Sequence, residues 1–338
     1  MLNYNLLFED ASSSTSNIPI ELLDNKHILI TGGSGLIGTH LLYSLATARK
    51  YRVNVKVTYV THNPPPEYFR SLPFEHITAD LTNYDSVKAL TEKCKGVDTI
   101  IHCATYGQPN KFLENKLGTI VLNTTTTTQL MKELNPKKFV FLSTSELYSG
   151  LTHEGFTEDQ IGTTNPSHPR SCYIESKRCG EAICNAFAEH GIDSKIIRLC
   201  LAYGPGTKVG DKRVLNSFIE KALTQKKITM LDRGDSLRTY GYVSDCIYMI
   251  LKIMLMGKQT TYNVGGVSTV KIKDVADIIG DILNVPVIIP DVCKGLEGTP
   301  AGTQLNLSKF YDEFGQIDFV DIRKGIERTV EWQKGLYL

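Results

Sequence analysis

The pattern with the clearest chemical potential in this 338-residue chain is a tyrosine followed four positions later by a lysine. On a helix this spacing places a phenol and an ammonium on one face. The positive charge can then lower the pKa of the phenol and make the tyrosine a usable proton acceptor. The pattern occurs at Tyr84/Lys88, Tyr173/Lys177 and Tyr248/Lys252. We expect at least two of the three copies to be ordinary helix pairs, so the surrounding sequence must select the functional one.

Only Tyr173 follows a hydroxyl-rich strand end, at residues 141–148 with the sequence Phe-Leu-Ser-Thr-Ser-Glu-Leu-Tyr. We expect such a strand end at the carboxyl edge of a parallel sheet, where open α/β folds bind their ligands. A hydroxyl at Thr144 can there hydrogen-bond the same substrate oxygen as Tyr173. The sequence therefore selects Tyr173, Lys177 and Thr144 as the candidate catalytic group.

A glycine-rich turn between an apolar strand and an apolar helix is the second candidate site. The strand is His27–Ile30, and Thr-Gly-Gly-Ser-Gly-Leu-Ile-Gly follows at 31–38. Glycines at 32, 35 and 38 permit a tight turn, let backbone N–H groups approach a pyrophosphate and allow close helix packing. The positive end of the helix dipole faces the same point. This arrangement predicts a dinucleotide-binding site.

The end of the second predicted strand bears on the choice between NAD and NADP. In dinucleotide-binding folds an acidic residue there usually binds the adenosine ribose. This chain has Val-Thr-His-Asn at 60–63, with neither an acid nor an arginine for a 2′-phosphate. We therefore expect NAD and leave NADP open. Asp80, after the third predicted strand, is placed either to reach the adenine edge or to cap the following helix.

These groups need a framework that brings several strand ends together. Apolar strand-like runs alternate with helical stretches and lie at His27–Thr31, Val53–Val60, Glu75–Thr78, Asp98–Cys103, Lys138–Ser143 and Ser194–Cys200. Continuous apolar strands separated by crossover-length helices indicate a parallel sheet covered on both faces. The predicted fold class is therefore α/β, with a doubly wound parallel sheet of the Rossmann type.

A smaller, discontinuous C-terminal substrate domain is expected beyond Tyr203, where Gly-Pro-Gly interrupts the alternation. Thr261–Val264 is a strand that could return to the large sheet. We predict a dinucleotide-binding domain of residues 26–202 and 239–264, and a substrate domain of residues 203–238 and 265–338. Residues 1–25 include a Ser/Thr-rich run and are predicted to be a flexible N-terminal extension.

Composition argues against several classes of protein. The chain has 37 Lys+Arg against 36 Asp+Glu, and 41% of its residues are apolar, unlike a disordered chain or a nucleic-acid binder. No apolar run approaches the roughly 18 residues of a membrane span, and the N-terminus lacks the basic segment of a signal peptide. The eight cysteines include no Cys-x-x-Cys pair. We therefore expect reduced thiols in a cytoplasmic protein, with no metal site and no membrane partner.

Six motifs, in order along the chain, resemble those of the extended short-chain dehydrogenase/reductases that act on nucleotide sugars. They are TGGSGLIG, IIHCAT, STSELYS, YIESK, RLCLAYGPG and LRTYGYVSD. The resemblance implies that Tyr173 takes the proton from the sugar 4-hydroxyl while hydride passes from C4 to the nicotinamide. It implies that Lys177 holds the nicotinamide ribose and that Thr144 hydrogen-bonds the reacting oxygen. An NAD-dependent enzyme, a nucleotide-diphosphate sugar as substrate, a 4-keto intermediate and a homodimer are also implied.

The residues after Thr144 bear on the step that follows the 4-keto sugar. Thr-Ser-Glu at 144–146 looks like UDP-glucuronate decarboxylases and also like GDP-mannose 4,6-dehydratases. Ser145 and Glu146 are therefore predicted to support decarboxylation or dehydration, and segments 169–178 and 211–219 are similar to those of the decarboxylases. A nucleotide-sugar 4-epimerase, in which Glu146 would be a spectator, is the near alternative. A non-catalytic dinucleotide-binding regulator on the same fold is the alternative from another class.

Further contacts follow from the same resemblance. The expected cofactor-binding residues are Gly32, Gly35, Leu36, Ile37, Gly38, Asp80, Leu81, Ala104, Tyr173 and Lys177. The expected substrate-binding residues are Tyr106, Gln108, Phe112, Arg213 and Arg238. Among these, Arg238 is expected to bind the nucleotide diphosphate bidentately. Residues 104–112 depart from the proline-rich loop of the decarboxylases, which leaves room for a different sugar.

Overall fold

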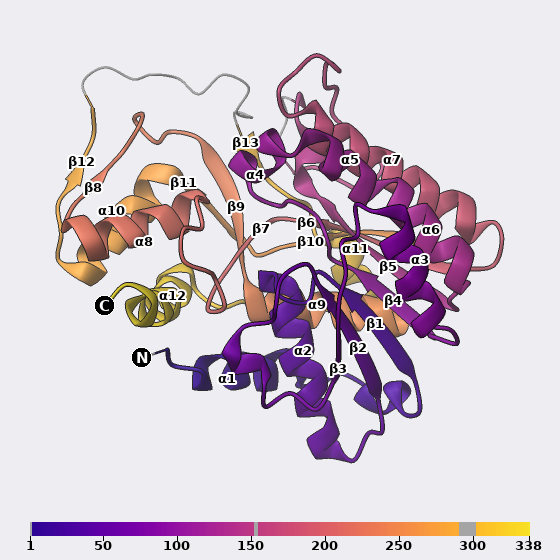
Figure 1. Ribbon diagram of the computed structural model, residues 1–338. Helices are drawn as coiled ribbons and strands as arrows, with labels where there is room; N and C mark the ends of the chain where they lie inside the picture. The colour runs from indigo at the N-terminus through magenta and orange to yellow at the C-terminus, as the bar shows by residue number, and fades with distance from the viewer. Residues whose placement is uncertain (1, 152–154, 291–301) are drawn as a thin grey trace.

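A seven-stranded parallel sheet forms the larger part of the molecule (Figure 1). The computed structural model describes residues 2–151, 155–290 and 302–338. From edge to edge the strands are β10 (Thr261–Val264), β6 (Asp193–Leu199), β5 (Lys138–Thr144), β4 (Thr99–His102), β1 (His27–Thr31), β2 (Lys56–Thr61) and β3 (Glu75–Thr78). Every neighbouring pair is parallel. The predicted doubly wound parallel sheet is confirmed, including the returning strand β10.

The strand order reverses at the centre of this sheet. The chain runs outward from β1 to β2 and β3, then returns to β4 on the other side of β1 and continues to β5, β6 and β10. At such a reversal a crevice opens at the carboxyl ends of the strands. Thr31 and His102, the last residues of β1 and β4, are register partners. The sheet therefore offers its ligand crevice at the position where the glycine turn begins.

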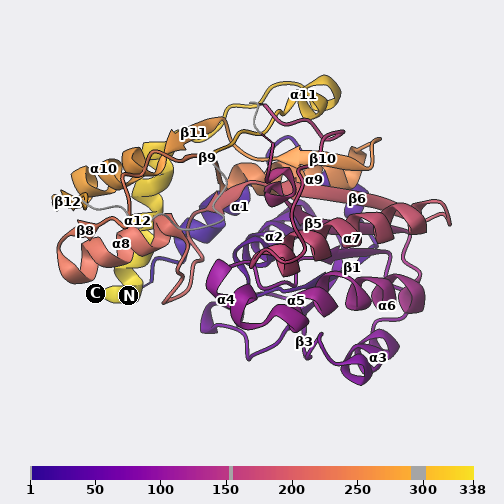
Figure 2. The same cartoon turned by 90° about the horizontal axis from the view of Figure 1, so that it is seen from above.

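Helices cover both faces of the sheet (Figures 1 and 2). On one face, α2 (Leu36–Ala48) and α9 (Val243–Met256) share an apolar core with Ile28 and Ile30 of β1. On the other face, α3 (Tyr84–Lys93), α6 (Thr125–Leu134) and α7 (Ser171–Ala188) share a core with Leu29. Alternate residues of a strand point to opposite faces, which explains the unbroken apolar sequence of β1. Within the described ranges, every helix is too short or too polar to pass through a lipid bilayer.

A smaller part with its own core lies beside the large sheet, at the left in Figure 1. Its strands are β7 (Leu201–Tyr203), β9 (Leu237–Tyr242), β11 (Ser268–Lys271) and β13 (Gly302–Thr303) in one sheet, and β8 (Ile228–Thr229) with β12 (Val287–Ile288) in another. Helices α8 (Val214–Gln225), α10 (Ile272–Leu283) and α12 (Ile322–Tyr337) pack around these strands. Two elements do not follow the domain boundaries predicted from the sequence. Strand β9 crosses the expected boundary, and α11 (Ser308–Phe314) packs beside β10 of the large sheet.

The N-terminal segment differs from the flexible extension expected for residues 1–25. Residues Asn5–Thr15 form helix α1, which packs against α2 and α9. Leu7 and Ala11 are fully buried there, so the helix belongs to the core of the large sheet. The Ser/Thr-rich run is compatible with a helix because its hydroxyls bond to helix carbonyls, as Ser12 does to Phe8. The Ser/Thr-rich composition suggested a flexible segment, although Leu7 and Ala11 form an apolar stripe along the helix.

A buried ion pair joins α1 to the smaller part. The Asp10 carboxylate of α1 accepts a hydrogen bond of 2.8 Å from Nη2 of Arg328 on α12. It also accepts hydrogen bonds of 3.0 Å from the Tyr242 hydroxyl, and Arg328 Nε donates to the same hydroxyl at 2.8 Å. Burial raises the pKa of Asp10, while His40 and Arg328 oppose that rise. Helix α1 therefore connects the two parts of the molecule through a polar contact in an apolar setting.

We predict that Arg328→Met destabilises the protein, because it leaves a carboxylate that is 3% exposed without its cation. The free energy of unfolding, measured with urea, should fall by about 2–4 kcal/mol, since removal of one member of a buried pair is strongly destabilising. Arg323→Met on the same helix is the control. Arg323 pairs with Asp281 on the surface at 3.1 Å, and its loss should cost less than about 1 kcal/mol. Equal losses in the two variants would contradict the prediction.

Candidate active site

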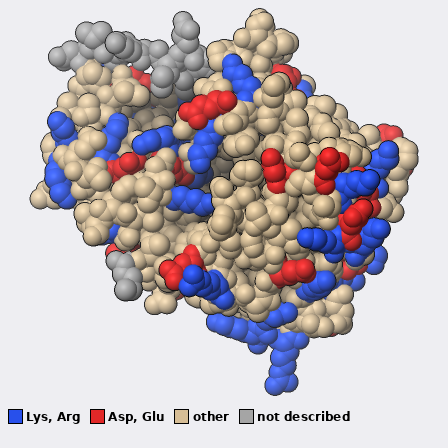
Figure 3. All heavy atoms as spheres, in the orientation of Figure 1, with Lys and Arg blue, Asp and Glu red and all other residues tan. Residues whose placement is uncertain are grey.

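A cleft of about 450 Å³ lies at the carboxyl ends of the large sheet, next to the smaller part. Figure 3 shows the hollow, with Lys and Arg side chains gathered around it. Most of the predicted site residues line it. They are Gly32, Gly35, Leu36, Ile37, Gly38, Asp80, Leu81, Ala104, Tyr106, Gln108, Thr144, Ser145, Glu146, Tyr173 and Arg213. The structure thus brings together residues from five of the six motifs singled out in the sequence, while LRTYGYVSD contributes none to the lining.

The glycine turn forms a tight cradle at the start of α2. Gly32 has a φ of 68°, and a Cβ at that position would lie 2.8 Å from the backbone of Ala104. A Cβ at Gly38 would collide with the carbonyl oxygen of Gly32. Gly35 is the N-cap residue of α2 and supplies no side-chain cap, so the first N–H groups of the helix remain available to an anion. These residues fit the pyrophosphate of a dinucleotide.

The far end of the cleft carries the polar groups that follow β2 and β3. His62 and Asn63 line it directly after β2, at the position where an acidic residue was absent from the sequence. Asp80 lines it as well, and its carboxylate accepts hydrogen bonds from the backbone and hydroxyl of Thr82 at 2.9 and 2.7 Å. These bonds hold the pKa of Asp80 below its usual range. Asp80 therefore stabilises the local turn and also lines the cleft.

Tyr173 and Thr144 meet in the middle of the cleft. Thr144 is the last residue of β5, and Tyr173 lies in the first turn of α7. Burial and the nearby Glu146 carboxylate raise the pKa of Tyr173 well above its usual value, while a hydrogen bond with Thr144 opposes the rise. The tyrosine ring stacks on Phe112 with centroids 4.8 Å apart and an interplanar angle of 7°. The two hydroxyls are therefore placed to share one ligand oxygen.

Lys177 lies one helical turn beyond Tyr173 and does not line the cleft. Its side chain is buried, and Nζ donates a hydrogen bond of 2.5 Å to the carbonyl of Leu142. Burial lowers the pKa of Lys177 to about 7. The positive charges that oppose the raised pKa of Tyr173 belong to Arg170 and Arg213. Its ammonium thus lies against β5, and the role of Lys177 in tuning the tyrosine stays a prediction.

Glu146 is held by a partner that the sequence interpretation missed. Its carboxylate accepts two hydrogen bonds from Arg170, one of them 3.1 Å from Nε and a shorter one from Nη2. The Arg170 guanidinium lies over the Phe112 ring, 5.2 Å from its centroid. Glu146 sits in the short helix η4 (Ser145–Tyr148), where its N–H donates to the Thr144 hydroxyl at 3.2 Å. A fixed carboxylate, rather than a solvated one, therefore faces the cleft beside Tyr173.

Two of the predicted substrate-binding residues are not placed as expected. Phe112 is 1% exposed and packs against Tyr173 instead of opening to the cleft. Arg238 is 9% exposed, lies outside the cleft lining and donates to its neighbouring carbonyl at Leu237 over 2.6 Å. Burial lowers the pKa of Arg238, while Tyr240 and Glu146 oppose that change. Arg238 thus lies near the Glu146–Arg170 pair rather than in the open cleft.

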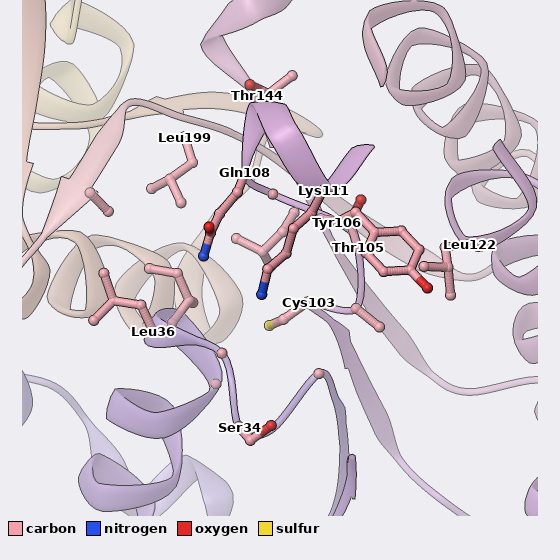
Figure 4. A pocket seen from close by; sticks show the side chains of 18 of the residues that line it. Ser34, Leu36, Cys103, Thr105, Tyr106, Gln108, Lys111, Leu122, Thr144 and Leu199 are labelled. Atoms are coloured by element: carbon pink, nitrogen blue, oxygen red, sulfur yellow. The ribbon is translucent and has the colours of Figure 1, made fainter. Parts of the chain in front are cut away.

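Other cleft residues were missed in the sequence. Lys111 and Lys208 line the cleft, and so do His62, Asn63 and Thr82. Figure 4 shows Lys111 and Gln108 extending into the cavity above the loop that carries Ser34. Arg170 directly precedes Ser171 and α7, within a segment already singled out by resemblance. No local pattern marked either lysine, because Lys111 reaches the cleft from α4 and Lys208 from the segment before α8.

Comparisons with known proteins identify relatives along most of the chain. A family model described as the NAD dependent epimerase/dehydratase family matches residues 28–265. UDP-glucuronic acid decarboxylase 6 of Arabidopsis thaliana is 30% identical over 312 residues, covering 89% of this chain and 87% of that protein. The epimerase Mth375 of Methanothermobacter thermautotrophicus has a TM-score of 0.82 at 17% identity, covering 98% of this chain and 96% of that one. The UDP-glucuronic acid 4-epimerase of Bacillus cereus, solved with UDP-glucuronic acid and NAD, has a TM-score of 0.78 at 24% identity, covering 92% and 100%.

We predict that Lys177→Met makes the protein more stable, because a buried amine is replaced by an apolar side chain of similar length. The native state binds fewer protons at Lys177 than the unfolded state between pH 7 and about 10. The wild-type protein therefore gains stability as pH rises through this range. The advantage of the variant, measured as the free energy of unfolding, should accordingly be larger at pH 6 than at pH 9.

Lys88→Met is the matched control, since Lys88 belongs to another Tyr-x-x-x-Lys copy and is exposed. It should change stability by less than about 0.5 kcal/mol at either pH. A stability difference between wild type and Lys177→Met that does not vary with pH would show that Lys177 titrates normally.

Proposed function

This chain belongs to the NAD dependent epimerase/dehydratase family, and from that membership we propose that it oxidises a nucleotide-diphosphate sugar at C4 and then decarboxylates it. UDP-glucuronate is the proposed substrate. Several relatives that align with most of the chain are named UDP-glucuronic acid decarboxylases, which supports this choice. The observation that carries the proposal is the Glu146 carboxylate, fixed by Arg170 beside Thr144 and Tyr173.

The first chemical step requires removal of the proton from the sugar 4-hydroxyl. Tyr173 is the proposed proton acceptor, and Thr144 would orient the same sugar oxygen through its own hydroxyl. Bound NAD would supply the hydride acceptor for C4 and a positive charge at its oxidised ring, with Lys177 holding its ribose. Because the pKa of Tyr173 is raised in the protein alone, proton acceptance would depend on the positive charge of the oxidised nicotinamide ring.

The second step follows from the chemistry of the oxidised sugar. A ketone at C4 makes the carboxylate of a uronate part of a β-keto acid. The electron pair of the bond between C5 and the carboxylate can therefore move toward the ketone as CO₂ leaves. C5 then takes up a proton from solvent, and Tyr173 would return its proton to the C4 oxygen when the bound cofactor reduces the ketone again. We propose that Glu146 holds the sugar ring during this step, with an orientation fixed by the two hydrogen bonds from Arg170.

Dehydration and 4-epimerisation share the first step and differ in the fate of the 4-keto sugar. The 4-epimerase is the second candidate, because the Bacillus cereus protein with the same fold is named a UDP-glucuronic acid 4-epimerase. In that alternative Glu146 takes no part in the chemistry. The homodimer and the cytoplasmic location expected from the sequence stay predictions.

We predict that the purified protein, without added cofactor, converts UDP-glucuronate to a product lighter by about 44 Da, the mass of CO₂. GDP-mannose, UDP-glucose, dTDP-glucose and CDP-glucose are incubated in parallel, and the product masses are measured. A loss of about 18 Da would replace decarboxylation by dehydration. An unchanged mass with inverted C4, seen by NMR, would establish the epimerase instead. No conversion at all, with NAD bound, would favour the non-catalytic regulator.

Tyr173→Phe should lower kcat by about 10²–10⁴-fold, because it removes the proton acceptor and keeps the ring that stacks on Phe112. Tyr84→Phe is the matched control. Tyr84 begins another copy of the Tyr-x-x-x-Lys pattern and is 59% exposed, so this variant should keep full activity. Similar losses in both variants would remove the case for Tyr173.

A further inference from the structure

The lining of the cleft contains both acidic and basic side chains, and two of its lysines lack an acidic partner among the described residues. Arg213 is paired with Asp211, whose two carboxylate oxygens both lie 3.1 Å from Nε. Glu146 is paired with Arg170, outside the lining. Lys111 and Lys208 also line the cleft, and neither forms an ion pair with any acidic residue in the part of the chain that the structure describes. Two cations facing one cavity indicate an anionic group in the ligand.

The two lysines come from two separate segments that line the cleft. Lys111 belongs to α4 (Pro109–Glu114), which follows β4, and Figure 4 shows its side chain extending into the cavity. Lys208 belongs to the segment 204–213 that joins β7 to α8. Burial and the charge of Lys111 lower the pKa of Lys208. The two ammonium groups are thus near enough to interact, and an anion bound to both would favour their charged forms.

The position of Lys208 indicates which anion this is. Its Nζ donates a hydrogen bond of 3.2 Å to the hydroxyl of Ser34. Ser34 lies inside the glycine turn, directly before the first residues of α2. The N–H groups at the start of α2 point to the same place, where a dinucleotide pyrophosphate fits. Lys208 therefore lies beside the glycine turn at the start of α2.

The segment that carries Lys208 is anchored on both sides of the cleft. Pro205 O accepts a hydrogen bond of 2.8 Å from Nε2 of the buried His40, which belongs to α2. Farther along, the backbone N–H of Lys212 donates to the side-chain oxygen of Gln108 at 3.4 Å, next to α4. Gly206 between these anchors has a φ of 95°, which an L-residue rarely adopts. The segment thus crosses the cleft along a fixed path.

We propose that Lys111 and Lys208 form a cation pair that closes over the diphosphate of bound NAD and retains the cofactor between turnovers. This inference rests on the proposed function, because it takes the dinucleotide as the ligand of the glycine turn. An enzyme that oxidises and later reduces the same sugar has to keep its reduced cofactor until the hydride returns. Loss of that cofactor in mid-cycle would leave the protein without a reductant, and charge on the open side of the cleft prevents that loss.

The test measures cofactor retention directly. Lys111→Met, Lys208→Met and the double variant are purified, their NAD content is determined after denaturation, and the exchange of bound for isotopically labelled NAD is followed by mass spectrometry. Each single variant should exchange NAD about tenfold faster than wild type, and the double variant about a hundredfold faster, as expected for loss of charge-assisted hydrogen bonds. Lys208→Arg should retain slow exchange, because it keeps the charge.

Lys212→Met is the matched control on the same segment. The Lys212 side chain pairs with Glu220 at 3.3 Å and not with the cleft, so its loss should leave exchange unchanged. Unchanged exchange in the double variant would overturn the proposal. If NAD exchange is unchanged but the KM for the nucleotide sugar rises, the lysines bind the diphosphate of the substrate instead. That result would also overturn the proposal. Lysine-dependent NAD retention in a protein that converts none of the tested sugars would sink the proposed function and leave this inference standing.

Discussion

The close backbone approach between the glycine turn and the end of β4 is the constraint on which the rest of the site depends. A side chain at Gly32 would place its Cβ 2.8 Å from the Ala104 backbone. This approach determines where α2 begins, and therefore where its unbonded N–H groups point. The chain beyond β4 lines the cleft as well, through Gln108 and through Lys111 of α4. One glycine thus sets the distance between two walls of the site.

The candidate catalytic groups lie where the apolar core makes their charged forms costly. Lys177 is 1% exposed with a pKa lowered to about 7, and burial raises the pKa of Tyr173. Each group is therefore least stable in the ionised form that its proposed role requires. Charges on the bound molecules therefore have to stabilise these ionised forms. These buried ionisable groups therefore lower the stability of the protein when the cleft is empty and become reactive when ligands are bound.

The framework could be predicted because a strand buried on both faces has an unbroken apolar sequence. Tyr173 could be predicted because it follows such a strand and lies on the expected edge of the sheet. Arg170 and Lys208 could not, because their roles depend on contacts with Glu146 and Ser34, which are 24 and 174 positions away in the chain. Helix α1 was missed for the same reason, since its apolar stripe has meaning only against α2 and α9. Local sequence patterns identify helices and strands, but the partners of the charged side chains in a site depend on tertiary contacts.

The Glu146–Arg170 pair shows how a carboxylate can lie beside a tyrosine that has to lose its proton. The negative charge of Glu146 raises the pKa of Tyr173, and the positive charge of Arg170 lowers it. Arg170 also packs over Phe112, which in turn stacks on the tyrosine ring, so the four side chains form one packed unit. An enzyme that oxidises C4 and then acts at C5 needs both a proton acceptor and a second polar group within one sugar ring of each other. The arginine makes these two requirements compatible, because it opposes the carboxylate's charge at the tyrosine and leaves the carboxylate in the cleft.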